Sequence, residues 1–460
     1  MTSTTIIDSF ELKLKTCVRE VAGKRKVFSA KWQNKNVFVK IFLHTDSAER
    51  HWKRDVDGIL LFNKKGILSP ALLWSGKFPA IKNICSDNAF GIILEAIPDA
   101  EAFSCRWENS NDKTRLVKKA VEVIAGHHKA GLIQRDLHFG NFLFSGDLCY
   151  SLDGDALHEY ELTPIEKAAE NYALLTAQAE VIHENLFAEQ IAEYCKLTSY
   201  DSEKFTALFN RFLMPLRKTR CHNLLKKIYR DCTAINTYNS PGRRSFIQSK
   251  FDSPELRKCI DNPESFFPKD KKKLLKNGNS ATVALINVNG QDLVVKRYNY
   301  SKNIKTFIRR FRKSRASISW SNAFRLLNYG LKTPEPYALV ETFKGPMIEH
   351  AYFIAEHIHG EDLLNFYKHS PSDEKALNIA GQMKDIFAVW KQCKIAHGDC
   401  KATNFILHNE RVFIIDLDAM HEMNSLKAFN KAHKKDIKRW MKNWEEDQAL
   451  TDLFKSEFRL

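Results

Sequence analysis

The sequence predicts an α+β chain made of two tandem copies of one unit, each with a small β-rich lobe followed by a larger helical lobe. Two observations support this fold class. A charged loop that leads into a short apolar strand occurs twice, at 134–155 and again at 397–420. In each half, β-branched and aromatic runs precede that loop, and the residues between the two halves, 163–236, are rich in helical patterns.

Local patterns in chain order predict the elements of the first copy. Val37–Phe42 is a β-branched and aromatic run typical of a strand, with Lys40 in its interior. The residues 54–70 indicate a helix that ends at a glycine stop and a turn. A further strand is predicted at Phe90–Ile97, with Glu95 near its end. These elements would form the small lobe ahead of the first charged loop.

The second copy begins with the same kind of elements. Strands are predicted at Ala281–Val288 and Asp292–Lys296, because a tight Asn289-Gly290 turn lies between two apolar runs. Asn277-Gly278-Asn279 just before them is a candidate phosphate-covering turn, and a plain hairpin turn explains its single glycine nearly as well. Near the end of the unit, Val412–Ile415 is predicted to be a strand that follows the second charged loop.

These elements divide the chain into two domains. A capping box at Thr163–Glu166, with Pro at the first helical position, predicts the start of the helices that complete the first larger lobe. Ser240-Pro241-Gly242 interrupts the pattern, and only a short helix is expected after it, near Pro254–Ile260. The predicted divisions are an N-terminal domain at 1–238, a linker at 239–269 and a C-terminal domain at 270–460.

The second charged loop has the parts that phosphoryl transfer from a nucleotide requires. One carboxylate orients the attacking hydroxyl and takes its proton, a second carboxylate and an amide hold Mg²⁺ on the phosphates, and a lysine neutralises developing charge. In HGDCKATNFILHNERVFIIDLDAM, the residues that fit these roles in that order are Asp399, Asp416, Asn404 and Lys401. The alternative interpretation is a polar turn between two buried strands.

The first charged loop repeats this spacing without a gap. Asp136, Asn141 and Asp153 each precede their C-terminal counterparts by 263 positions, which indicates an internal duplication. The upstream landmarks agree at slightly different offsets, as loop insertions would produce, and they pair Lys40 with Lys296, Pro70 with Pro334 and Glu95 with Glu356.

Composition limits the classes of function. The 460 residues are 44% hydrophobic and 27% charged, so the chain can bury sizeable cores. Lys+Arg 71 against Asp+Glu 55 gives a net charge of +16, which indicates an anionic partner: a nucleic acid, a membrane surface or a phosphorylated glycan. A nucleic-acid partner is disfavoured, because no helix-turn-helix, zinc-finger or RNA-binding signature is apparent.

Cysteine usage and hydropathy indicate a reducing compartment and at most a peripheral membrane contact. The ten cysteines are scattered singly, without a C-x-x-C pair, and Met1–Phe10 shows no signal-peptide pattern. No apolar run approaches the ~20 residues that a membrane span requires. If the protein meets a membrane, we expect it to lie on the surface.

One basic stretch suggests how such a contact could be made. Nine of the twenty residues of Lys296–Arg315 are basic. Helical spacing would place Ile304, Phe307, Ile308 and Phe311 on one face, with Arg309, Arg310, Arg312 and Lys313 off that face. This pattern is typical of a basic amphipathic helix that rests on anionic lipid or on the phosphates of a glycolipid. The alternative is a helix whose apolar face packs on the small lobe.

The C-terminal half resembles the bacterial lipopolysaccharide core kinases, which phosphorylate heptose or Kdo sugars and have a protein-kinase-like fold. The resemblance covers most of 270–425. The matching segments are VVKRYN around Lys296, SWSNAFRLLNYGLKTPEPYALVE from Ser319, AYFIAEHIHGEDL around Glu356, HGDCKATNF around Asp399 and VFIIDLDAM around Asp416. The N-terminal half, through DLHFGN, more loosely resembles small-molecule phosphotransferases such as the aminoglycoside and choline kinases.

The resemblance implies ATP and Mg²⁺ as cofactors and assigns roles by position. The strand lysine would contact the α- and β-phosphates, and a glutamate at the hinge would read the adenine through its backbone; these are Lys296 and Glu356, with Lys40 and Glu95 as their N-terminal counterparts. The catalytic bases would be Asp399 and Asp136, and the Mg²⁺ ligands would be Asn404, Asp416, Asn141 and Asp153.

Both copies depart from the kinase pattern. Kinases of this fold usually pair the strand lysine with a helix glutamate, whereas the aligned positions hold Asp55 in the first copy and Ser319 in the second. The local partner of Lys296 is therefore left open. In the first copy His138 stands where the second has Lys401, and neither copy shows a Gly-rich loop.

Three functional hypotheses follow. The first is a kinase that phosphorylates a sugar of the lipopolysaccharide core at the cytoplasmic face of the membrane, with that core or another glycolipid as acceptor. The second is a protein or small-molecule kinase of the same fold, because fold alone does not define the acceptor. The third is a pseudokinase pair that senses nucleotide or scaffolds envelope biogenesis, an interpretation that stays open for the first copy.

Overall fold

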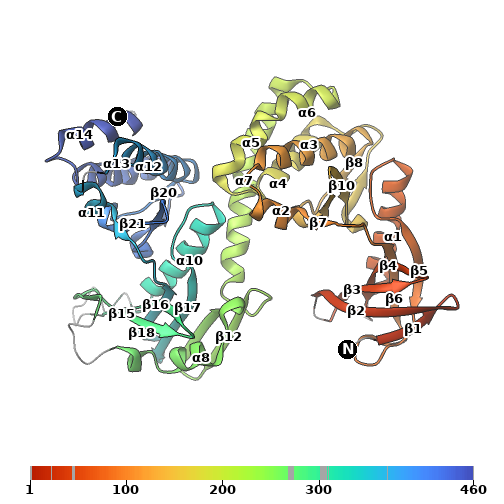
Figure 1. The fold of residues 1–460 in the computed structure, drawn as a ribbon, viewed down its shortest axis with the longest axis horizontal. Coiled ribbons are helices and arrows are strands. Elements are labelled where there is room, and N and C mark those ends of the chain that lie inside the picture. Colours follow the sequence, from red (N-terminus) through yellow and green to blue (C-terminus); the bar gives the residue numbers. More distant parts are fainter. Residues whose placement is uncertain are drawn as a thin grey trace. The chain divides into compact units, whose positions relative to one another are not determined.

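The computed structural model describes residues 3–21, 23–43, 47–267, 274–300, 308, 310–369 and 371–458. The chain divides into two compact units (Figure 1), which consist of Met1–Ala179 with His183–Lys218 and of Glu180–Ile182 with Thr219–Leu460. Both units combine an antiparallel sheet with a group of helices, which confirms the predicted α+β class.

A six-stranded antiparallel sheet opens the first unit. Its strands lie in the order β1 (Ser3–Ile7), β2 (Phe10–Val21), β3 (Arg25–Trp32), β4 (Lys35–Phe42), β6 (Ala89–Glu95) and β5 (Leu72–Phe78). Along β4, Val37, Val39 and Ile41 are buried in one core cluster. Lys40 therefore projects from the opposite face, because side chains alternate along a strand. That face packs against α1 (Ala48–Lys64), which begins earlier than the predicted helix at 54–70.

The helical part of the first unit surrounds its own core. Its helices are α2 (Phe103–Asn109), α3 (Lys113–Lys129), α4 (Ile165–Thr176), α5 (Glu184–Glu189), α6 (Ile191–Thr198) and the first part of α7 (Ser202–Lys227). Short strands lie beside them: β7 (Glu101–Ala102), β8 (Leu132–Gln134), β9 (Phe142–Ser145), β10 (Leu148–Ser151) and β11 (Leu157–Glu159). The predicted capping box is wrong. Pro164 occupies the cap position itself, and the Thr163 hydroxyl donates to the His128 carbonyl instead.

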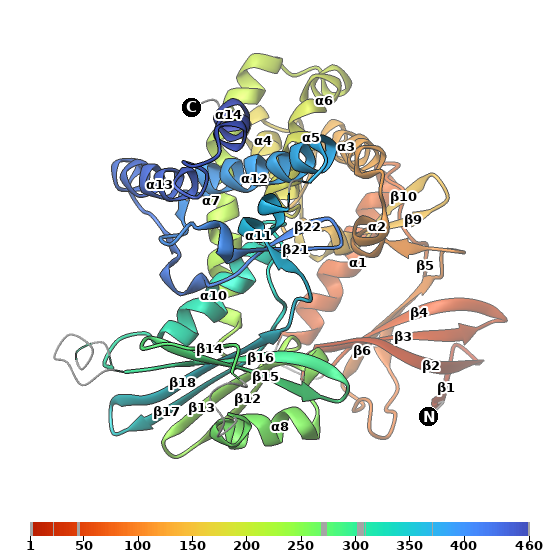
Figure 2. The ribbon, with the colours of Figure 1, turned by 60° about the vertical axis from the view of Figure 1, so that its left-hand side comes forward.

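The second unit contains a seven-stranded sheet. Figure 2 labels its strands. Their order is β12 (Ile235–Ser240), β13 (Arg243–Gln248), β17 (Pro336–Lys344), β18 (Met347–Glu356), β16 (Gln291–Tyr298), β15 (Ala281–Val288) and β14 (Lys276–Asn277). The predicted hairpin at Asn289-Gly290 is confirmed, because both residues have positive φ, as a type I′ turn requires.

The residues from 239 to 267 in the predicted linker, 239–269, are instead part of this sheet and its covering layer, and 268–269 lie outside the described residues. β13 pairs with β17 over Arg243–Ile247, and Pro241-Gly242 makes the turn between β12 and β13. The predicted short helix is present as α8 (Pro254–Asp261). Its apolar residues pack on one face of the sheet, while Trp320 of α10 (Arg315–Asn328) packs on the other. Without these residues, one apolar face and one edge of the sheet would be open to solvent.

The helical part of the second unit follows the sheet. Its helices are α11 (Leu363–Lys368), α12 (Asp373–Cys393), α13 (Leu426–Met441) and α14 (Gln448–Phe458). The short strands among them are β19 (Glu361–Asp362), β20 (Ile395–Ala396), β21 (Phe405–His408), β22 (Arg411–Ile414) and β23 (His421–Glu422). Buried Trp390, Trp440 and Phe454 join α12, α13 and α14 into one core. The hairpin β21–β22 confirms the strand predicted at Val412–Ile415.

The predicted basic helix is only partly covered by the described residues. Residues 301–307 and 309, which include Ile304, Phe307 and Arg309, lie outside them. Residues 310–312 form a turn and a bend and 313–314 have no regular secondary structure, so the helix is not present over 310–314. Ile308 and Phe311 are 52% and 54% exposed. No helix among the described residues is long and apolar enough to span a bilayer, and all ten cysteines are free.

Candidate active site

A cavity of about 390 Å³ in the second unit brings together most of the predicted C-terminal site residues. Its lining includes Lys296 from β16, Glu356 from the end of β18, Lys401 and Asn404 from the charged loop and Asp416 from the end of β22. Much of the remaining lining is apolar, as expected for a pocket that buries a planar base. The predicted residues, which are spread over 120 positions, thus converge in space.

The structure identifies the partner of Lys296 that the sequence left open. Its Nζ lies 2.5 Å from Asp416 Oδ1 and 3.3 Å from Asp418 Oδ2, and it lies over the ring of Tyr298. Burial acts to lower the pKa of Lys296, but the negative charge around it outweighs burial and raises that pKa. Lys296 therefore stays protonated and carries positive charge into the cavity.

Asp416 is the matching anion. Burial acts to raise the pKa of its carboxyl, and the charge of Lys296 and the hydrogen bond from it outweigh burial, so that pKa is lowered. Its backbone has φ of 60°, in the left-handed region that few non-glycine residues adopt. Such conformations recur at functional sites, where surrounding contacts hold them. The left-handed turn lets the chain leave β22 with the carboxylate directed at Lys296.

Asp418 and Arg315 were not among the predicted site residues. The Asp418 side chain is 6% exposed and lies 2.7 Å from the Arg315 guanidinium, in addition to its contact with Lys296. Ser319, which aligns with the usual helix glutamate, lies 2.7 Å from the Tyr298 hydroxyl instead. The sequence offered a clue to Asp418, because it is the second Asp of the D-L-D triplet. No local motif pointed to Arg315 as a site residue.

The charged loop holds Asp399 beside Lys401 and Asn404. The Asn404 amide donates to the Asp399 carbonyl at 2.8 Å and to its carboxylate at 3.3 Å, and the Lys401 ammonium lies 3.1 Å from that carboxylate. The Asp399 side chain is 36% exposed. This carboxylate is thus fixed in orientation yet accessible to a molecule arriving from solvent, as a base that acts on a separate acceptor must be.

Asp436 of α13 holds this loop in place through its backbone. Its buried carboxylate accepts hydrogen bonds from the backbone N–H of His397 at 2.7 Å and of Gly398 at 3.0 Å. Burial raises the pKa of Asp436 to about 6. His397 is also buried, which lowers its pKa, and its Nε2 lies 3.2 Å from the Ile415 carbonyl. Asp436 lies outside every motif, so sequence reasoning missed it.

Glu356, for which the resemblance implies a hinge position, lines the wall of the cavity. The Glu356 N–H donates to the Glu335 carbonyl at 2.9 Å, and the following N–H, of His357, donates to the Asp292 carbonyl at 3.0 Å. Both N–H groups are therefore already engaged within the protein. His357 and Ile358 line the same cavity.

The first unit has a smaller cavity, of about 250 Å³, with the corresponding residues. Its lining includes Lys40, Asp55, Glu95, Asn141 and Asp153. The Lys40 ammonium donates to the fully buried Asp55 and lies 3.4 Å from Asp153. Burial raises the pKa of Asp55. Burial acts in the same direction on Asp153, but the charges of Lys40 and Arg25 outweigh it and lower that pKa. The helix carboxylate predicted for this copy is thus in contact with its lysine.

The charged loop of the first unit has the same local geometry. The Asn141 amide donates to the Asp136 carbonyl at 2.7 Å, as Asn404 does to Asp399 at 2.8 Å. Asp153 has φ of 62°, close to the value at Asp416. The two units differ in the side chain that holds the start of this loop. In the first unit the Asn171 amide donates to the Gln134 carbonyl, near the place where the second unit has the carboxylate of Asp436.

A close backbone contact, present in the first unit, is a further difference between the two units. In the first, Gly58 of α1 meets Gly154 so closely that a Cβ on Gly58 would lie 2.2 Å from the Gly154 carbonyl oxygen. Only glycine fits here, and the contact draws α1, with Asp55, toward Lys40. In the second unit, Asn322 of α10 spans the corresponding distance with a hydrogen bond of 2.9 Å to the Leu417 carbonyl. The helix thus supplies a carboxylate only in the first unit.

Comparison with known proteins relates one part of the chain to a family. No curated protein matches the sequence. Among solved structures, two of WbdD are similar: a high-resolution crystal structure (12% identity, TM-score 0.32, covering 46% of this chain and 48% of that one) and a structure described as the bifunctional kinase-methyltransferase (13%, 0.32, 46% and 49%). This chain thus spans about half the length of those proteins. The family model that matches, over 267–456, is that of the lipopolysaccharide kinase (Kdo/WaaP) family, and the matched segment includes the larger cavity and the loop of Asp399.

Proposed function

We propose that the second unit is an ATP-dependent kinase that phosphorylates a heptose or Kdo sugar of the lipopolysaccharide core. The observation that carries this proposal is the convergence of Lys296, Asn404 and Asp416 on one cavity within the segment matched by the family model. The loop of Asp399 borders this cavity through Lys401 and Asn404. A nucleotide in the cavity would thus present its terminal phosphate to the loop that holds the base.

The donor set supports the proposed Mg²⁺ site. Asp416 and Asn404 offer a carboxylate and an amide oxygen, the hard ligands that Mg²⁺ prefers, and both line the cavity. When bound, Mg²⁺ neutralises charge on the phosphates. Lys296 adds a second positive charge beside Asp416. As the sugar oxygen bonds to the γ-phosphorus and the bond to the ADP oxygen breaks, Asp399 accepts the hydroxyl proton.

Loss of one phosphate from the glycolipid is the direct test. Mass spectrometry of lipid A–core from a deletion strain and its parent should show a species lighter by one phosphate in the deletion strain. The wild-type gene should restore this phosphate, and a gene with Asp399→Asn should not. An unchanged core would reject this acceptor. It would favour another kinase substrate, or a pseudokinase scaffold for envelope biogenesis.

We also propose that the two units are a tandem pair of protein-kinase-like domains, with the first in a structural or regulatory role. The repeated loop geometry supports the pairing, and the smaller cavity and His138 in place of Lys401 support the weaker role. If so, Asp136→Asn with Asp153→Ala should reduce phosphoryl transfer without abolishing it, as measured by turnover of the purified chain. Complete loss in a folded variant would make the first unit the catalytic one.

The acceptor surface is proposed to lie at the inner face of the cytoplasmic membrane. A second cavity of the same unit, also about 390 Å³, is lined by Arg244, Arg310, Arg312 and Lys313. Arg244 is paired with Glu341, and the ammonium of exposed Lys313 donates to the Ser321 hydroxyl at 2.7 Å; Arg312 is also exposed. Such a cluster fits the phosphates of a glycolipid or an anionic membrane surface, where each basic residue contributes about 1 kcal/mol.

Changing Arg310, Arg312 and Lys313 together to Gln should therefore weaken sedimentation with anionic vesicles and raise the KM for a membrane-embedded acceptor. Turnover of a soluble acceptor should be unchanged, because these residues are not among those lining the nucleotide cavity. The matched control removes three exposed lysines of α13: Lys431, Lys434 and Lys435. Equal loss of vesicle binding in both variants would show that only net charge matters.

A further inference from the structure

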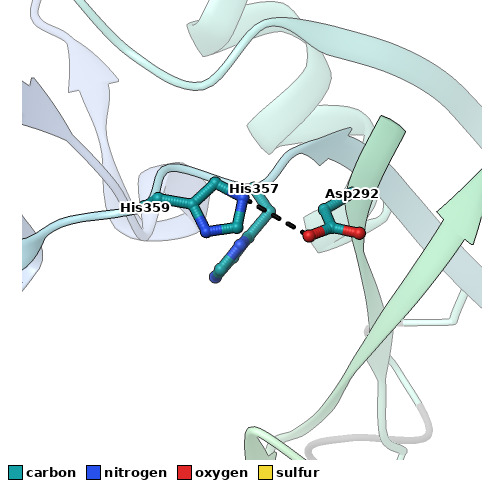
Figure 3. A group of neighbouring side chains, drawn as sticks. All are labelled: Asp292, His357 and His359. Carbon is teal, nitrogen blue, oxygen red and sulfur yellow. Dashed lines mark ion pairs between the residues drawn. The ribbon is translucent and has the colours of Figure 1, made fainter. Parts of the chain in front are cut away.

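Three potential metal ligands gather beside the hinge of the second unit, outside the proposed Mg²⁺ site. Asp292 comes from β16, and His357 and His359 follow β18 (Figure 3). Each offers one ligand atom, and the three atoms lie within 4.8 Å of one another. His359 Nε2 is 3.4 Å from Asp292 Oδ2. Among the described residues, this is the one group of at least three such ligands.

Neighbouring groups orient these ligands. The Asn287 amide donates to Asp292 Oδ1 at 2.7 Å, which leaves Oδ2 directed at His359. The His359 carbonyl accepts from the His408 ring at 2.6 Å, which holds the segment in place. Hydrogen bonds of this kind to ligating carboxylates and their backbone are the usual support of metal sites.

His357 supplies the second independent observation. Its Nδ1 is buried and has no hydrogen-bond partner among the described residues, although an unpaired buried nitrogen is costly. A ring with an unsatisfied buried nitrogen, beside a second histidine and a carboxylate, is thus available for coordination.

One of the three ligand separations agrees with a tetrahedral transition metal. Two ligands at about 2.0–2.1 Å from Zn²⁺ at the tetrahedral angle lie about 3.4 Å apart, the distance already present between His359 and Asp292. Two imidazoles with one carboxylate favour Zn²⁺ and its neighbours over Mg²⁺, which binds oxygen ligands. Three protein ligands would leave a fourth position for water.

We infer that Asp292, His357 and His359 form a Zn²⁺-class site that ties β16 to the hinge. His357 and Ile358 also line the large cavity, so the metal restrains a wall of the nucleotide pocket. The restraint of the pocket wall rests on the proposed nucleotide site; the metal site itself does not. Bound metal thereby alters nucleotide affinity, because a hinge already ordered loses less freedom when nucleotide binds.

The test begins without nucleotide. Micromolar Zn²⁺ should raise the melting temperature of the full chain, whereas the same concentration of Mg²⁺ should not. His359→Ala should lose the zinc-dependent rise, and it should fold because His359 is 63% exposed. Asn287→Ala, which removes the support of Asp292, should weaken zinc binding about 10–100-fold in a chelator competition.

The matched control is His369→Ala. His369 is an exposed histidine that lies 3.4 Å from Glu361, the same separation, but without a third ligand. The His369→Ala variant should keep the full zinc-dependent rise in melting temperature. Equal responses of wild type and His359→Ala, or no response in either, would overturn the site.

Nucleotide titrations with and without Zn²⁺ then separate the two proposals. A zinc-dependent change in nucleotide affinity in wild type but not in His359→Ala supports the coupling, and unchanged affinity overturns it. Zinc binding by a chain that binds no nucleotide would leave the metal site standing and reject the kinase assignment.

Discussion

Asp399→Asn is expected to lower the rate of phosphoryl transfer by about 10²–10⁴-fold, the usual contribution of a general base. The amide cannot accept the hydroxyl proton, yet it has the same shape and can still accept from Asn404, whose main contact is to the Asp399 carbonyl. Turnover of the purified chain with ATP and a core acceptor measures the effect. Melting temperature and nucleotide affinity should stay close to wild type.

Glu410→Gln is the matched control for that variant. Glu410 is an exposed carboxylate in the turn between β21 and β22, so its loss changes charge equally without touching the loop. It should keep wild-type turnover. If Asp399→Asn also kept it, the second unit would not be the site of transfer.

Asp436→Ala is expected to be the most damaging change outside the cavity. It leaves the buried N–H of His397 without an acceptor and also removes the acceptor of the Gly398 N–H, so the free energy of unfolding should fall by roughly 1–3 kcal/mol. Turnover should fall as well, because the charged loop loses its anchor. Asp436→Asn keeps one acceptor oxygen and should lose less in denaturant unfolding. Equal stability of the Ala variant and wild type would contradict the anchoring role.

The pH dependence of stability gives an independent test of Asp436. Its pKa is about 6 in the folded state, above the ordinary value of 3.8, because of burial. A raised carboxyl pKa stabilises the folded state below pH 4, and this stabilisation is lost as pH rises through 6. Relative to Asp436→Asn, which does not titrate, wild type should lose roughly 3 kcal/mol between pH 4 and pH 7. A constant difference over that range would show that burial does not govern this carboxyl.

Local spacing was enough to locate the elements closest to the chemistry. The strand of Lys40, the hairpin at Asn289-Gly290 and the strand that ends before Asp416 were each predicted from a few contiguous residues, and each is present. The family match over 267–456 likewise agrees with the resemblance found in the sequence. The capping box at Thr163 failed because its hydroxyl found a tertiary acceptor, the His128 carbonyl.

What the sequence by itself determined is the pair of repeated loops and the resemblance of the second half to a kinase family, because the residues of each loop lie within one stretch of chain and keep their spacing. Only the tertiary structure decided the partner of Lys296, the anchor at Asp436 and the pairing of Arg243–Ile247 with the second sheet. These depend on contacts between residues far apart in the chain, for which no local pattern exists. Burial then determines their charge states, and burial is a property of the packed fold alone.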